Sequence, residues 1–116
     1  MITQIIPKLP FIQKSESLDF YVRILGFTLM SDYGDYLLLK RDGLEIHLFH
    51  FPSLQPTASD FMIYLRVDEG IEAMFACIES EKVRKLYPLE QKTWGQKEFS
   101  VIDPSGTLLT FGQASR

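Results

Sequence analysis

The fold is decided by one stretch near the end of the chain, Trp94-Gly95-Gln96-Lys97-Glu98-Phe99-Ser100-Val101-Ile102-Asp103-Pro104-Ser105-Gly106-Thr107-Leu108-Leu109-Thr110-Phe111. Phe99 and Val101 alternate there with polar neighbours, as residues of a half-buried strand do. Asp103-Pro104-Ser105-Gly106 has the composition of a turn, because Pro presets one φ angle, Gly tolerates unusual angles and Asp accepts hydrogen bonds from the backbone. β-branched and apolar residues follow at 107–111, so we expect an antiparallel hairpin that is entered through an indole.

The chain opens with a predicted strand and helix. Residues 2–11 are apolar but contain Pro7 and Pro10, which cannot donate to a sheet ladder, so this strand is expected at an edge or interrupted. Ser15 is the predicted cap of a helix that ends at Gly26. The apolar stripe of this helix is Leu18, Tyr21, Val22 and Leu25.

Further strands are predicted at 27–30, 36–40 and 44–49, with Arg41-Asp42-Gly43 as a hairpin turn. The last of these alternates clearly, with one face formed by Leu44, Ile46 and Leu48 and the other by Glu45, His47 and Phe49. A second series follows, with a strand at 61–67, a helix and a short strand at 83–86 before the hairpin. The stripe of the second helix is Ile71, Met74, Phe75 and Ile78.

The order of strand, helix and three strands thus occurs twice, which predicts an α+β fold built from two βαβββ modules. The modules span about 1–52 and 60–113 of a single domain, 1–116. At an offset of 55 residues Phe20 falls on Phe75, and the strand led by Gly43 corresponds to the strand led by Gly106. One module alone would leave a sheet face bare, so the two are expected to pair.

Composition narrows the classes of function. The net charge is −3 and no run of Lys or Arg stands out, which argues against a nucleic-acid surface. No apolar run approaches the ~20 residues that span a bilayer, so no membrane contact is expected. Cys77 is the single cysteine, which excludes an intrachain disulfide and favours a reducing, cytoplasmic location. Its apolar neighbours predict that Cys77 is buried.

Three segments, in this order and spacing, carry a family resemblance. They are Ser17-Leu18-Asp19-Phe20-Tyr21 followed by Leu25-Gly26-Phe27, then Asp42-Gly43-Leu44-Glu45-Ile46-His47-Leu48-Phe49, and the terminal hairpin with its Trp-Gly-x-x-Glu-Phe and Asp-Pro-x-Gly patterns. The chain resembles the glyoxalase/bleomycin resistance (vicinal oxygen chelate) superfamily, on the bleomycin-resistance branch. The resemblance implies two βαβββ modules that form a curved mixed sheet around a cleft.

Enzymes of that superfamily hold a divalent metal with four protein ligands, at positions that fall here near Ile6, Glu45, Met62 and Thr110. Of these, only Glu45 is a good ligand, whereas a catalytic metal needs about three. A register shifted by two residues adds His47, which still provides ligands from one strand only. We therefore expect no metal, cofactor or catalytic residue. The alternative is a metal-dependent lyase or isomerase of the glyoxalase or dioxygenase type.

The bleomycin-resistance branch sequesters a bulky, planar, cationic antibiotic without chemistry. The resemblance implies a homodimer with its cleft at the interface, often with exchange of the first strand. Pro7 and Pro10 stand where the hinge of such an exchange would lie, and they also fit a simple interrupted edge strand. To bind a bleomycin-like ligand, a site needs flat aromatic rings for stacking and negatively charged or polar groups that pair with the ligand's positive charge. The candidate site residues are Trp94, Tyr36, Tyr33, Phe49, His47, Glu45 and Glu98.

Structural roles compete with these assignments. Trp94 also fits a plug at the end of the hairpin, and a strand residue such as Glu98 is most often a solvated charge. Met62 and Tyr64 share a strand face and are expected to line the floor of the cleft. A third function, a scaffold domain that binds a protein partner, would show a dimer interface without an open cleft.

Overall fold

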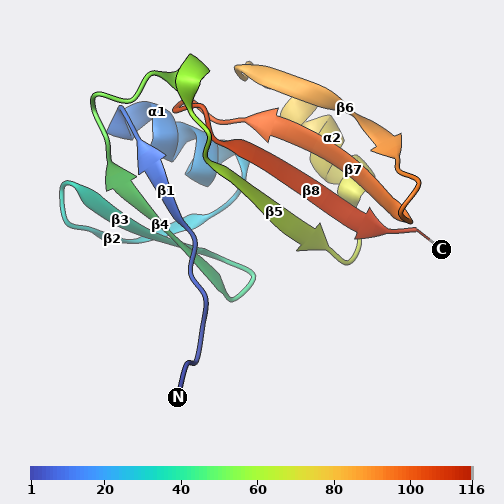
Figure 1. The fold of residues 1–116 in the computed structure, drawn as a ribbon, viewed down its shortest axis with the longest axis horizontal. Coiled ribbons are helices and arrows are strands. Elements are labelled where there is room, and N and C mark those ends of the chain that lie inside the picture. Colours follow the sequence, from blue (N-terminus) through green and yellow to red (C-terminus); the bar gives the residue numbers. More distant parts are fainter. Residues whose placement is uncertain (116) are drawn as a thin grey trace.

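A computed structural model describes residues 1–115, and its strands form two four-stranded sheets (Figure 1). The first sheet has the order β1-β4-β3-β2 and contains β1 (Lys8–Phe11), β2 (Thr28–Asp32), β3 (Tyr36–Arg41) and β4 (Leu44–His50). The second has the order β5-β8-β7-β6 and contains β5 (Met62–Val67), β6 (Lys85–Gln91), β7 (Gln96–Ile102) and β8 (Leu108–Ala114). In each sheet the first strand pairs in parallel with the last, and the other pairs are antiparallel. The predicted α+β fold of repeated βαβββ units is confirmed.

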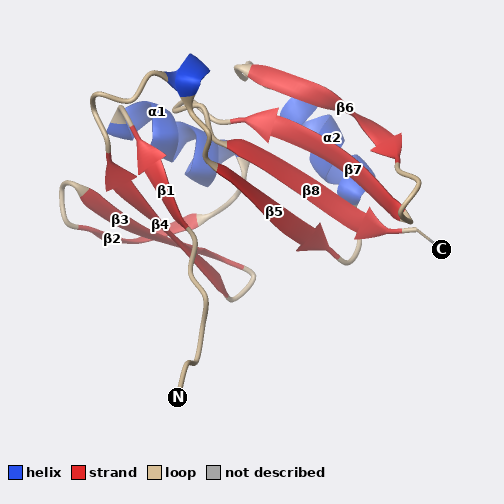
Figure 2. Ribbon diagram, viewed as in Figure 1, coloured by secondary structure: helices blue, strands red, loops and turns tan. Residues whose placement is uncertain are grey.

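The longer helical segments lie on one side of the sheets. The helical segments are α1 (Lys14–Leu18), the π-helix η1 (Asp19–Ile24), the 3₁₀-helix η2 (Pro56–Ala58) and α2 (Ile71–Glu79). Figures 1 and 2 show the sheets side by side, with α1 and α2 behind them. Each sheet therefore has a covered face, packed on helices, and an open face. Within the described residues, no helix has the length and hydropathy required to cross a membrane.

The first helix differs from its predicted form. It begins at Lys14 rather than behind a Ser15 cap, and the N-cap residue Gln13 makes no side-chain capping bond. The chain then widens into the π-helix, where the amide of Leu25 bonds the carbonyl oxygen of Phe20. A π-turn has more residues than an α-turn, so the apolar stripe rotates. Val22 is consequently 37% exposed, whereas Phe20 is buried.

Two predictions in the second half are also wrong. The strand expected at 83–86 is β6 (Lys85–Gln91), whose pairing with β7 shifts register between Tyr87 and Glu90, around Pro88. An edge strand tolerates such a proline because its outer amide needs no partner in the sheet. Cys77 is exposed rather than buried. It lies beside the i, i+3, i+4, i+7 stripe of α2, which buries Ile71 and Ile78 instead.

The hairpin turn joins the two halves of the chain through a buried hydrogen-bond network. Oδ1 of Asp103 accepts from the amides of Ser105 and Thr107, at 2.8 and 2.9 Å. Its Oδ2 accepts from the hydroxyl of Tyr21 in η1, at 2.5 Å, and both side chains are buried. Burial and the neighbouring carboxylate raise the pKa of Tyr21, so its hydroxyl stays protonated and donates. The Asp103-Pro104-Ser105-Gly106 turn, predicted from its composition, is thus bonded to the first helical segment through Tyr21.

Replacing Tyr21 with Phe should lower the free energy of unfolding by about 1–3 kcal/mol, because it leaves a buried carboxylate oxygen without its donor. Urea denaturation followed by circular dichroism measures the change. Tyr33→Phe is the matched control, since Tyr33 is exposed and its loss should stay within about 0.5 kcal/mol. Equal midpoints for the two variants would contradict a stabilising role of the Tyr21–Asp103 bond.

Candidate ligand-binding site

The open face of the second sheet holds a buried carboxylate between two aromatic side chains. Glu98 of β7 is only 7% exposed, so the expectation of a solvated charge is wrong. Its Oε2 accepts from the hydroxyl of Tyr64 in β5, at 2.6 Å, and from Nε1 of Trp94, at 3.0 Å. Trp94 lies in the loop before β7 and is 64% exposed, so the indole is fixed at its nitrogen while much of its ring surface stays accessible.

The electrostatics of Glu98 favour its charged form. Burial raises the pKa of this carboxyl, whereas the hydrogen bonds from Trp94 and Tyr64 lower it. The nearby charges of Lys92 and Arg66 lower it further, so the pKa lies below its ordinary value and Glu98 is ionised at neutral pH. Burial and the bond to Glu98 raise the pKa of Tyr64, which therefore remains a donor.

A pocket of about 260 Å³ opens beside this carboxylate. It is lined by Tyr87, Pro88, Glu90, Lys92, Trp94, Glu98, Phe99, Ser100 and Thr110. The hydroxyls of Ser100 and Thr110 lie 2.8 Å apart and satisfy each other on the floor. Exposed rings beside an ionised carboxylate suit a flat, positively charged ligand, because stacking and charge pairing act together.

The open face of the first sheet carries a second polar chain. Nε2 of His47 bonds Glu45, and Nδ1 of the same ring lies 2.7 Å from the hydroxyl of Tyr36. Because a carboxylate only accepts, we assign the imidazole proton to Nε2, so that Nδ1 accepts from Tyr36. Phe49, on the same face, has its ring centroid 5.9 Å from that of Phe61. The alternation of 44–49 is confirmed, and it places His47 in contact with Glu45 on one side and with Tyr36 of β3 on the other.

The predicted site residues thus form two groups on different sheets. We name Trp94, Glu98 and Tyr64 the indole half-site, and Glu45, His47 and Tyr36, with Phe49, the histidine half-site. Tyr33 lies exposed in the turn between β2 and β3. The bond between Tyr64 and Glu98 joins residues 34 positions apart and was missed. Its only sequence signal is Gly112, whose missing side chain leaves room for the Tyr64 ring.

Lysine and arginine side chains accompany the aromatic rings, which the sequence did not suggest. Four rings each have a cation over them at 4.9 to 6.0 Å from the centroid. The pairs are Lys8 with Tyr36, Arg66 with Tyr64, Lys85 with Tyr87, and Lys92 with Trp94. Such cation–π contacts favour these ring positions.

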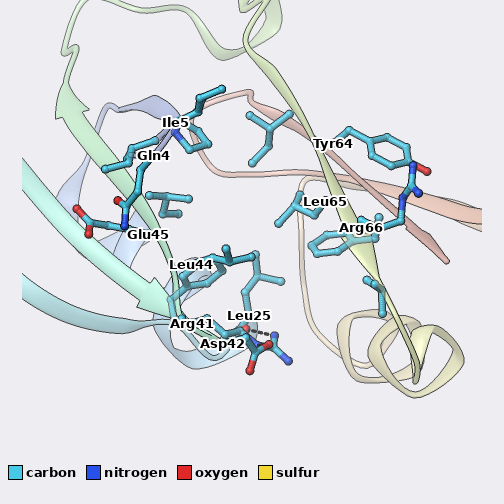
Figure 3. A pocket seen from close by; sticks show the side chains of 18 of the residues that line it. Gln4, Ile5, Leu25, Arg41, Asp42, Leu44, Glu45, Tyr64, Leu65 and Arg66 are labelled. Atoms are coloured by element: carbon cyan, nitrogen blue, oxygen red, sulfur yellow. Dashed lines mark hydrogen bonds and ion pairs between the residues drawn. The ribbon is translucent and has the colours of Figure 1, made fainter. Parts of the chain in front are cut away.

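An apolar groove of about 510 Å³ separates the two modules. Its walls come from residues 4–7, from the β3–β4 turn with β4, and from β5. In Figure 3, Leu65 points into the groove, whereas Tyr64 and Arg66 point to the other side of β5. Leu44 at its rim is exposed, as are Ile2 and Ile5 of the N-terminal segment. Apolar surface of this kind usually marks a contact with another molecule.

The side chains present do not fit the superfamily's divalent metal. Met62 is exposed, and the hydroxyl of Thr110 is bonded to Ser100. Glu45 is bonded to His47, whose other nitrogen is taken by Tyr36. Among residues 1–115, His, Cys, Asp and Glu form no group of three or more that could hold a metal ion. A catalytic centre would need about three firm ligands.

Comparison with known proteins agrees with this geometry. The family model described as Glyoxalase/Bleomycin resistance protein/Dioxygenase superfamily matches residues 13–111. A bleomycin resistance protein of Klebsiella pneumoniae is 32% identical over 94% of this chain and 90% of its own length. One from Geobacillus stearothermophilus is 28% identical over 95% and 96%. The crystal structure of a bleomycin-binding protein complexed with bleomycin is 27% identical, with a TM-score of 0.86 over 98% of this chain and 100% of that one. The chain belongs to the glyoxalase/bleomycin resistance protein/dioxygenase superfamily, as its three sequence segments predicted.

Proposed function

We propose that this protein binds bleomycin-type glycopeptides and sequesters them without chemistry, which would confer resistance. The observation that carries the proposal is the indole half-site, where the exposed Trp94 donates its ring N–H to an ionised Glu98. A heteroaromatic ring can stack on the free indole face while a cationic group approaches the carboxylate. Relatives that cover nearly the whole chain are bleomycin resistance proteins, and a similar solved structure contains bleomycin, which supports this choice of ligand.

Sequestration fits the chemistry of the side chains better than catalysis does. Both half-sites offer rings, hydroxyls and carboxylates that can hold a ligand, but no three firm ligands for a metal that would polarise it. Trapping an antibiotic requires only that the bound state be stable. Residues that stack and pair charges are sufficient for that purpose.

We also propose that the binding unit is a homodimer. The two half-sites lie on sheets that stand side by side (Figure 1). Within one chain they therefore do not face each other across a space that a single ligand could fill. A second copy can bring its histidine half-site over the indole half-site. Ile5 lines the apolar groove, and Ile2 lies exposed in the same N-terminal segment, which is consistent with a segment that contacts or exchanges with its partner.

Bleomycin titrated into the protein should quench Trp94 emission, because Trp94 is the single tryptophan and its free face would receive the ligand ring. Trp94→Ala should weaken binding by about 2 kcal/mol, roughly a 30-fold rise in Kd, since truncated aromatic anchors cost this much. Isothermal titration calorimetry measures both proteins.

Val22→Ala serves as the control, because Val22 is exposed on η1, away from both open faces. Its Kd should equal that of the wild type. The proposed function is wrong if bleomycin at high micromolar concentration changes neither the fluorescence nor the heat of mixing.

Light scattering should give a mass twice the 13.4 kDa of one chain. Ile2→Ser combined with Ile5→Ser should raise the dimer Kd at least about tenfold, because each buried isoleucine contributes about 1.5–3 kcal/mol. Val22→Ser, which adds a hydroxyl outside the groove, should leave the mass unchanged. A wild-type mass of a single chain at tens of micromolar would rule out the dimer.

A further inference from the structure

Gly112 lies beneath the ring of Tyr64. A Cβ atom built on Gly112 would lie 1.8 Å from Oη of Tyr64 and 2.6 Å from its Cζ, far inside van der Waals contact. In the sheet, Gly112 of β8 pairs with Arg66 on one side and with Glu98 on the other. The Tyr64 side chain therefore crosses β8 over Gly112 on its way from β5 to Glu98 in β7.

Space, rather than backbone conformation, is the reason for a glycine here. Six of the seven glycines in the chain have a positive φ angle, and Gly112 is the exception. Any residue could adopt the extended backbone conformation of Gly112, but only glycine, which has no side chain, leaves space for the Tyr64 ring to cross β8. The constraint thus concerns Tyr64 and not the local fold of β8.

We propose that Gly112 is a positioning residue of the ligand site: it admits Tyr64 across β8, so that Tyr64 and Trp94 together clamp Oε2 of Glu98 and leave Oε1 facing the pocket. Within the described residues both donors reach Oε2 and none reaches Oε1. Because Glu98 is buried and lines the pocket, Oε1 is left for a donor from the ligand. Resting on the proposed function, this assigns to the carboxylate a cationic N–H group of the ligand, such as a protonated amine or an amidinium.

Removing the Tyr64 clamp should change the titration of Glu98. The charged groups that face this carboxylate are Arg66 on β5, Lys92 after β6 and Glu90, its cross-strand neighbour on β6. Arg66 also lies over the Tyr64 ring, so Tyr64→Phe, which keeps the ring, is the variant that removes the hydroxyl donor alone. Loss of the Tyr64 donor removes a bond to the ionised form, so the pKa of Glu98 should rise toward its ordinary value.

The experiment uses the ligand-free protein and its single tryptophan, bonded to Glu98. Emission of Trp94 is recorded against pH, while circular dichroism verifies that the fold persists. The wild type should show an acid transition below the usual range of a glutamate, and Glu98→Gln should abolish it. Gly112→Ala and Tyr64→Phe should both move the midpoint upward. A transition that survives in Glu98→Gln, or midpoints that do not move in either other variant, would overturn the proposal.

A double-variant cycle separates positioning from general damage to β8. In a Tyr64→Ala background no ring crosses the strand, so adding Gly112→Ala should leave the emission and the midpoint unchanged. If Gly112→Ala shifts the midpoint equally with and without the tyrosine ring, Gly112 does not act through Tyr64 and the proposal fails.

Calorimetry with bleomycin then tests the ligand part separately. Gly112→Ala and Tyr64→Phe should each raise the Kd several-fold, and Glu98→Gln should raise it more. Unchanged affinity in all three would refute the role of Oε1 as the ligand's acceptor. Absence of binding by the wild type would refute the proposed function, whereas the shifted acid transitions would still support the Gly112 clamp.

Discussion

The structure depends on one constraint: each four-stranded sheet has helices on one face only. A sheet face without helices must be polar, be covered by another chain or hold a ligand, because a bare apolar face is unstable in water. Here the open faces carry hydroxyls, carboxylates and rings arranged in hydrogen-bonded chains. Because each module has helices on one face of its sheet only, the other face is exposed, and the two half-sites lie on these exposed faces.

Glu98 shows how such a surface can carry a buried charge. A carboxylate removed from water is unfavourable unless donors replace its hydration. Tyr64 and Trp94 provide two donors, and both bind the same oxygen. Within the described residues no donor reaches the other oxygen, which is the atom we propose for a cationic ligand. The proposed preference for a cationic ligand therefore rests on one acceptor oxygen rather than on a high net charge.

Local patterns predicted the fold well because strands and turns depend on near neighbours. The alternation in 44–49 and the Asp-Pro-Ser-Gly turn placed β4 and the β7–β8 hairpin correctly. Predictions failed where the backbone leaves regular geometry, as in η1, where a π-turn exposes Val22 and buries Phe20. They failed also where partners are distant in sequence. The burial of Glu98 depends on Tyr64, 34 residues away, and on the space above Gly112, and no period or motif encodes either.

The exposed thiol of Cys77 offers a practical handle on the molecule. It lies on α2, which covers the second sheet on the side opposite the indole half-site (Figure 2). A dye or a tether joined to this sulfur would leave the open face accessible, and as the single cysteine it would react at one position only. The protein could therefore be immobilised in a uniform orientation as a capture reagent, with Trp94 still available as an independent optical signal.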